Sequence, residues 1–127
     1  MLKRFLIYLL LIGEIFFLTG CGALLVGAGA VGGTILWQGG KIISEENASM
    51  KQASQAVQAA FKAKDIMLKE RVTRDKLIQF RGEGPNNERV AVDIFKVSKN
   101  SVRIEIRVGL GDEDKARDLL TQIKNRL

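Results

Sequence analysis

Four runs of the chain alternate apolar and polar residues, which is the pattern of a strand with one buried face. The runs fall at residues 66–72, 78–81, 90–94 and 101–108, and the last is the most regular. Short connections rich in turn-forming residues separate them. This arrangement predicts a four-stranded antiparallel meander with one face against the core and the other against water.

Two segments with apolar residues at every third or fourth position flank the meander, and each predicts a helix with one buried side. The first covers about residues 47–64, with Ser44 as its expected N-cap and acidic residues in its first turn. The second runs from its cap, Asp112, to Leu127. The order helix, four strands, helix predicts an α+β fold, a two-layer sandwich with both helices on one face of the sheet.

The first 20 residues have the pattern of a bacterial secretory signal. Lys3 and Arg4 precede an apolar run at residues 5–18, and small residues then lead to Cys21, the only cysteine. We therefore expect residues 1–20 to be removed as a signal peptide, so that the mature chain begins at Cys21. The alternative is an uncleaved membrane anchor that carries an incidental cysteine.

The segment Leu18-Thr19-Gly20-Cys21 resembles the lipobox of bacterial lipoproteins. The resemblance implies cleavage before Cys21 and a covalent diacylglycerol on its sulfur, which would tether the chain to a membrane; no other cofactor is expected. Gly22 stands where a signal for retention in the inner membrane usually carries Asp. By the same resemblance, we expect the protein at the periplasmic face of the outer membrane.

Residues 22–40 contain seven glycines and no charged side chain. The spacing from Gly27 to Gly32 matches a dinucleotide-binding G-x-G-x-x-G, but that motif needs a preceding strand in a βαβ unit. Here the stretch lies just after Cys21, next to the expected lipid, and no parallel α/β pattern follows it. Two interpretations of the segment remain open, a flexible tether or a membrane-proximal helix that packs closely on others. The helix would place small residues at its contact face and an aromatic residue at the lipid headgroups, namely Gly29, Gly32, Gly33 and Trp37.

The chain contains no histidine, and 20 Lys and Arg against 14 Asp and Glu give it a formal net charge of +6. The lack of histidine excludes His-based acid–base catalysis, Ser-His triads and His-ligated metal sites. Paired acids such as Glu45 and Glu46 fall where helix starts are expected, and capping explains them. We therefore expect neither an enzyme nor a metal site.

Five basic residues fall on the polar phase of the predicted strands, so one basic sheet face is a candidate binding site. Its expected partner is an anionic envelope polymer or an acidic envelope protein. An ordinary solvated face, neutralised by acids such as Glu105, is the alternative. Nucleic acid is not an expected partner, because the face lacks interleaved aromatic residues. The five residues are Lys69, Arg71, Arg81, Arg103 and Arg107.

Most of the chain resembles a family of small, functionally uncharacterised bacterial lipoproteins that join a lipobox and a glycine-rich segment to a helix, four strands and a last helix. The matching parts are the lipobox, residues 22–40, the strand and turn at 101–109, and the helix at 112–127. The expected organisation is a signal peptide at 1–20, a membrane-proximal segment at 21–43 and a periplasmic domain at 44–127. The expected function is a non-catalytic interaction domain in envelope assembly or maintenance. The alternative is a homo-oligomeric membrane-associated protein, held together by the glycine-rich segment.

Overall fold

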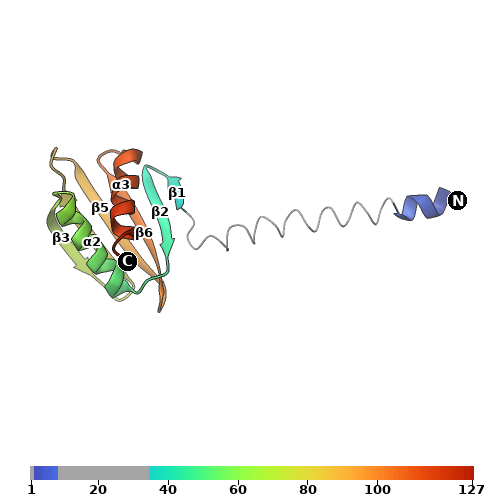
Figure 1. The fold of residues 1–127 in the computed structure, drawn as a ribbon, viewed down its shortest axis with the longest axis horizontal. Coiled ribbons are helices and arrows are strands. Elements are labelled where there is room, and N and C mark those ends of the chain that lie inside the picture. The colour runs from blue at the N-terminus through green and yellow to red at the C-terminus, as the bar shows by residue number, and fades with distance from the viewer. Residues whose placement is uncertain (1, 9–34) are drawn as a thin grey trace. The chain divides into compact units, whose positions relative to one another are not determined.

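The computed structural model describes residues 2–8 and 35–127, which belong to two separate compact units. Residues 2–8 form a helical segment with exposed side chains. In these two described ranges, no helix is both long enough and apolar enough to cross a membrane. Residues 35–127 fold into six strands and two helices (Figure 1).

All six strands of this unit form one antiparallel sheet, in the order β1-β2-β6-β5-β4-β3. The α+β class and the meander of four strands, β3 to β6, are therefore confirmed. The predicted number of strands is wrong, because two further strands extend the sheet beside β6. The elements are β1 Ile35–Gln38, β2 Lys41–Glu46, α2 Met50–Ala63, β3 Met67–Thr73, β4 Leu77–Glu83, β5 Arg89–Ser98, β6 Ser101–Val108 and α3 Glu113–Lys124.

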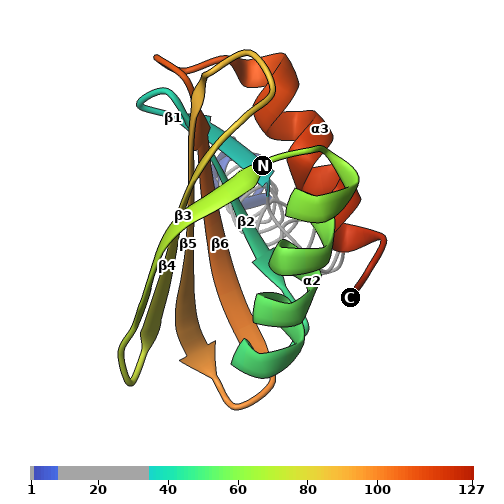
Figure 2. The same ribbon diagram turned by 90° about the vertical axis from the view of Figure 1, so that its left-hand side faces the viewer.

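Both helices pack on the same face of the sheet, here called the helix-covered face (Figure 2). Alternate residues of β6, among them Ile104 and Ile106, are fully buried beneath them, as the period of two predicts. Helix α2 turns small residues such as Ala53 and Ala60 toward the sheet, and α3 contributes Ile123. The core therefore lies between this face and the two helices.

Strands β1 and β2 form a hairpin where the sequence suggested a linker followed by a helix start. Gly39 and Gly40 have φ values of 63° and 78°, as a tight two-residue turn between antiparallel strands requires. β2 then pairs along β6 and buries Ile42 in the core. The folded domain consequently begins well before residue 44, the boundary expected from the sequence.

The alternation in β2 escapes detection because two of its core-facing residues are polar. Ser44 is fully buried and Glu46 nearly so, on the same side of the strand as Ile42. The Ser44 hydroxyl donates a hydrogen bond of 2.7 Å to Glu46 Oε1, and Lys124 Nζ on α3 lies 3.7 Å from the same oxygen. These contacts compensate for removing the two polar groups from water.

The helix starts show which caps the sequence predicts correctly. Asp112 caps α3, since its carboxylate accepts a hydrogen bond from the Lys115 backbone N–H at 3.1 Å. The cap of α2 is Ser49, which forms a reciprocal capping box with Gln52. Ser44 as the cap of the first helix is therefore wrong, because that residue pairs within the sheet.

A fragment that begins at residue 44 lacks β1 and the first half of β2, including the fully buried Ile42. We expect it to be less stable than a fragment of residues 33–127 by at least about 2 to 5 kcal/mol, the usual cost of truncating one buried isoleucine to alanine. Urea unfolding of both fragments, followed by circular dichroism, measures the difference. Equal unfolding midpoints would contradict the assignment of β1 and β2 to the domain.

Candidate functional site

The second face of the sheet, here called the open sheet face, is covered by no helix of residues 35–127. The strand registers place five side chains in one row across it, from β2 to β3. Most side chains of the face are half-buried, because neighbours on adjacent strands shield one another. The row consists of Ile43, Glu105, Asp93, Gln79 and Val72.

Acidic residues on the open sheet face neutralise much of its basic charge. Arg81 Nη1 lies 2.6 Å from Asp93 Oδ1, and Lys41 Nζ lies 3.1 Å from Glu105 Oε1. Asp93 and Glu105 face each other directly across β5 and β6, a pairing that is unfavourable between like charges. Their two basic partners offset that repulsion. The face is therefore an array of mixed charge.

Arg103 is held differently from the other basic residues of the face. Its guanidinium lies over the ring of Phe95, 4.5 Å from the ring centroid, in a cation–π contact. Its Nε atom is buried and makes no hydrogen bond among the described residues. The contact with the ring thus restricts where the guanidinium lies, and its Nε has no hydrogen-bond partner there.

The remaining basic residues expected on this face have separate environments. Lys69 Nζ lies 3.6 Å from Glu83 Oε2, near the β3 edge. Arg107 Nη2 donates a hydrogen bond of 2.5 Å to the Gly39 carbonyl oxygen, and so ties β6 to the β1–β2 turn. In residues 35–127, no ion pair within 4 Å joins a carboxylate to Arg103 or Arg107.

Arg71 lies on the helix-covered face, so its predicted place beside the other four residues is wrong. A β-bulge in β3 falls between Leu68, which pairs with Gly82, and Glu70, which pairs with Arg81. The extra residue reverses the alternation, and Arg71 then pairs with Phe80 on the buried side. Sequence alternation cannot reveal this reversal, because the bulge depends on how β3 pairs with β4.

The contacts of Arg71 are structural. Its Nη2 donates a hydrogen bond of 3.2 Å to the hydroxyl of Ser54 on α2. Its guanidinium also lies 5.4 Å from the centroid of the Phe80 ring. The side chain therefore links the edge of the sheet to the helix above it.

Of the residues expected near the membrane, the structure describes only Trp37. Cys21, Gly29, Gly32 and Gly33 lie outside the described residues, so their roles stay predictions. Trp37 belongs to β1 and is partly buried against the domain core. This residue is thus part of the folded sheet, and a helix that reaches Trp37 is excluded.

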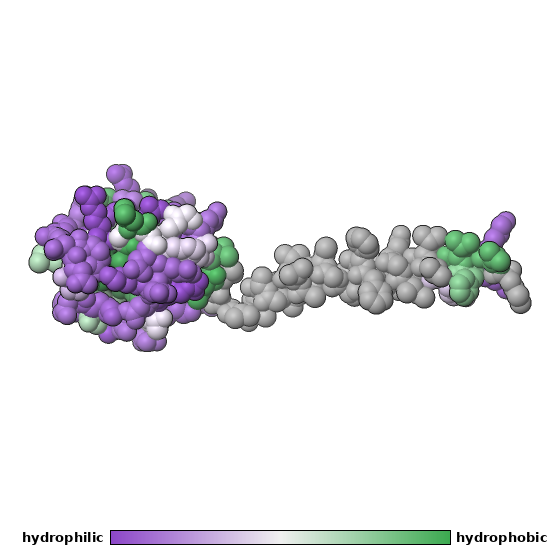
Figure 3. Space-filling model, turned by 90° about the horizontal axis from the view of Figure 1, so that it is seen from above, coloured by the Kyte–Doolittle hydropathy of each residue, from purple (hydrophilic) through white to green (hydrophobic). Residues whose placement is uncertain are grey.

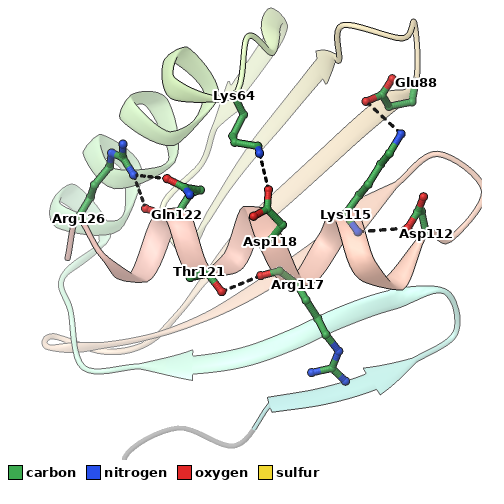
Figure 4. A network of polar contacts seen from close by, with 9 residues as sticks. All are labelled: Lys64, Glu88, Asp112, Lys115, Arg117, Asp118, Thr121, Gln122 and Arg126. Atoms are coloured by element: carbon green, nitrogen blue, oxygen red, sulfur yellow. Dashed lines mark hydrogen bonds and ion pairs between the residues drawn. The ribbon is translucent and has the colours of Figure 1, made fainter.

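A cleft of about 350 Å³ lies between the end of α2, the β4–β5 loop and α3. Two ion pairs span it: Lys64 Nζ to Asp118 Oδ2 at 2.6 Å, and Lys115 Nζ to Glu88 Oε1 at 3.7 Å (Figure 4). Sequence analysis missed this site because its residues come from three separate segments and form no local pattern. Since each lysine is paired with an acid across the rim, the cleft offers no concentrated charge to a ligand.

Neither surface brings together the groups of a recognisable catalytic centre. Within residues 2–8 and 35–127, no group of His, Cys, Asp and Glu side chains is arranged to hold a metal ion. One end of the domain presents a largely hydrophilic surface with small separate apolar areas (Figure 3).

The fold and this surface define a two-layer α+β protein with an open antiparallel sheet. Residues 4–126 match the family described as a protein of unknown function (DUF3568), and the chain belongs to that family. The expected resemblance to an uncharacterised family over most of the chain is therefore confirmed. No curated protein matches the chain.

Replacing Arg71 with alanine should lower the free energy of unfolding by about 1 to 2 kcal/mol, because a hydrogen bond and a cation–π contact are lost. Arg74, an exposed arginine in the turn after β3, provides the matched control. Arg74→Ala should change stability by less than about 0.5 kcal/mol. Urea unfolding of both variants tests the reversed register, and equal losses would contradict it.

Proposed function

We propose that the protein is a lipoprotein, anchored through Cys21 to the periplasmic face of the outer membrane, whose domain binds an envelope component without catalysis. The lipobox-like segment Leu18–Cys21 and the following Gly22 support the anchor and its location. Two acyl chains or more give stable membrane attachment, which suits a protein that must stay in place while it binds a partner. A role in envelope assembly or maintenance fits this organisation.

The mixture of charged and apolar side chains on the open sheet face is the observation that supports binding. Charged pairs such as Arg81–Asp93 alternate on it with apolar residues such as Ile43 and Phe95. A partner with both charged and apolar groups can match such a surface, as protein interfaces commonly do. A uniform polyanion would instead have to compete with Asp93 and Glu105 for their basic partners. We therefore favour a folded envelope protein as the partner.

Arg103 is the residue of this face best placed to hold an acidic group of that partner. Its guanidinium is already in contact with Phe95, so less side-chain entropy is lost when it binds. A guanidinium can form two parallel hydrogen bonds with one carboxylate, which adds geometric specificity. Arg103 would thus recognise a carboxylate within an otherwise mixed interface.

The anchor is tested with Cys21→Ser in the full-length chain. The substitution removes the sulfur that carries the diacylglycerol, so radiolabelled palmitate should enter the original chain and be lost from the variant. Immunoblotting establishes that both chains are present in equal amount. Equal labelling of the two would contradict the lipoprotein proposal.

The binding face is tested by a photoreactive amino acid placed at Gln79, in the central row of the open sheet face. Gln55, an exposed glutamine on α2, is the matched control on the opposite side of the domain. Irradiation of intact envelopes should yield one discrete protein adduct from position 79 and none from position 55. The same adducts from both positions, or none from position 79, would contradict the assignment of the face.

A further inference from the structure

The sheet of the described domain ends in two edge strands, and the edges differ in chemistry. β1 and β3 each pair with one neighbouring strand within residues 35–127, so each leaves one row of backbone groups without a strand partner there. Such edges can pair with another chain unless charges, bulges or proline prevent it. Comparison of the two shows which edge is available for pairing.

The β3 edge carries features that oppose pairing with a second copy. Its bulge at Lys69 breaks the regular ladder, and Lys69, Glu70 and Arg71 are all charged. An antiparallel pair of β3 strands centred on Glu70 would set that carboxylate against its own copy. It would also set Lys69 against Arg71 of the second copy, and directly opposed like charges destabilise a sheet.

Within residues 35–38, the β1 edge carries none of these protective features. Its sequence, Ile35–Gln38, contains no charge and no proline, and its pairing with β2 is regular. Ile35 and Leu36 are 40% and 50% exposed, so the strand presents apolar side chains together with its backbone groups. This is the combination that strand pairing buries.

The hairpin geometry determines which backbone groups of β1 face outward. Gln38 and Lys41 close a two-residue turn, and such a closing pair exchanges hydrogen bonds within the hairpin. Since the pattern alternates, Leu36 also bonds to β2. The N–H and C=O groups of Ile35 and Trp37 therefore point away from β2, toward the free edge.

We propose that a second copy of this chain pairs with β1 in antiparallel orientation, centred on Leu36. Ile35 then lies opposite Trp37 of the second copy, and these two pairs exchange four backbone hydrogen bonds. Leu36 meets its own copy on the open side of the sheet. A register centred on Trp37 makes only two such bonds among the residues of β1, so the Leu36 register is favoured.

Side chains next to this edge fit the same partner. A groove of about 300 Å³ between the hairpin and α3 is lined by the apolar residues Ile35, Ile42 and Leu120, together with polar residues of α3 and its C-terminal end. Ile35 and Trp37 both project to the helix-covered side, because they pair with the buried Ser44 and Ile42. Trp37 of the second copy, opposite Ile35, would therefore stand beside the groove, where it could contact the apolar residues of the lining.

Pairing of this kind joins two six-stranded sheets edge to edge, with both open sheet faces on one side. The surface offered to a partner would then be doubled, and binding of two linked copies would gain avidity. The inference does not rest on the lipid anchor. An anchor would, however, raise the local concentration of the copies on one membrane and so favour pairing.

A disulfide between two copies tests the register directly. Leu36 faces its copy as a non-hydrogen-bonded pair, with Cα atoms about 4.5 Å apart, a separation that a disulfide can span. In the full-length chain in its membranes, mild oxidation of Leu36→Cys should give a disulfide-linked homodimer. Leu68→Cys, at the 43% exposed Leu68 of the β3 edge, is the matched control and should not.

The unmodified chain, which retains Cys21, reports any crosslink from that thiol. Equal dimer from both variants, no dimer from Leu36→Cys, or a crosslink from position 36 chiefly to a different protein would each overturn the proposal. Strand addition by another chain is the interpretation that the last result would support.

Disruption of the edge provides an independent readout. Leu36→Lys places two ammonium groups together at the centre of the pair, and Leu68→Lys adds the same charge at the other edge. Light scattering in mild detergent should give a dimer for the unmodified chain and for Leu68→Lys, and a monomer for Leu36→Lys. A dimer that survives Leu36→Lys, or a monomeric unmodified chain, would contradict pairing through β1.

Discussion

Burial of a single sheet face under α2 and α3 is the interaction on which the rest of the structure depends. Fully buried residues of the central strands, such as Phe80, Ile94 and Ile104, form this layer, and each contributes about 1.5 to 3 kcal/mol. Because side chains alternate along a strand, a slip of one residue would bring Arg103 and Glu105 into the core. Packing of the core thereby fixes the register, and the register determines which side chains form the open sheet face.

The strands of the meander and the last helix could be predicted because their periodicity follows directly from this one-sided burial. β2 could not, since Ser44 and Glu46 occupy core positions and become acceptable only through their contacts with each other and with Lys124. The Gly39-Gly40 turn could not be distinguished from the other glycines of the glycine-rich segment at residues 22–40. The place of Arg71 depends on a bulge. The place of β2 depends on its pairing with β6, and the bulge depends on how β3 pairs with β4; an alternating pattern within one segment contains neither pairing.

The pairing of β5 with β6 also determines the charge of the binding surface. Four of the five basic residues expected there have side chains on the open sheet face. The acidic residues Asp93 and Glu105, which pair across β5 and β6, lie among them. Of the two faces expected, a basic one and one neutralised by acids, the structure has the second, with Arg103 in contact with Phe95. Of the two expected partners, an anionic envelope polymer and an envelope protein, we accordingly propose the protein. The proposed pairing through β1 would extend this surface without altering its chemistry.

Both proposed surfaces depend on the extension of the sheet through β2 and on the coverage of only one of its faces by α2 and α3. Adjacent isoleucines test it, because Ile42 is fully buried and Ile43 belongs to the open sheet face. Cysteine substituted at each position should differ in its reaction with a maleimide in the folded full-length chain, with the unmodified chain correcting for Cys21. We expect rapid labelling of Ile43→Cys, and labelling of Ile42→Cys only after unfolding. Equal rapid labelling of both, as a linker at residues 41–43 would give, would contradict it.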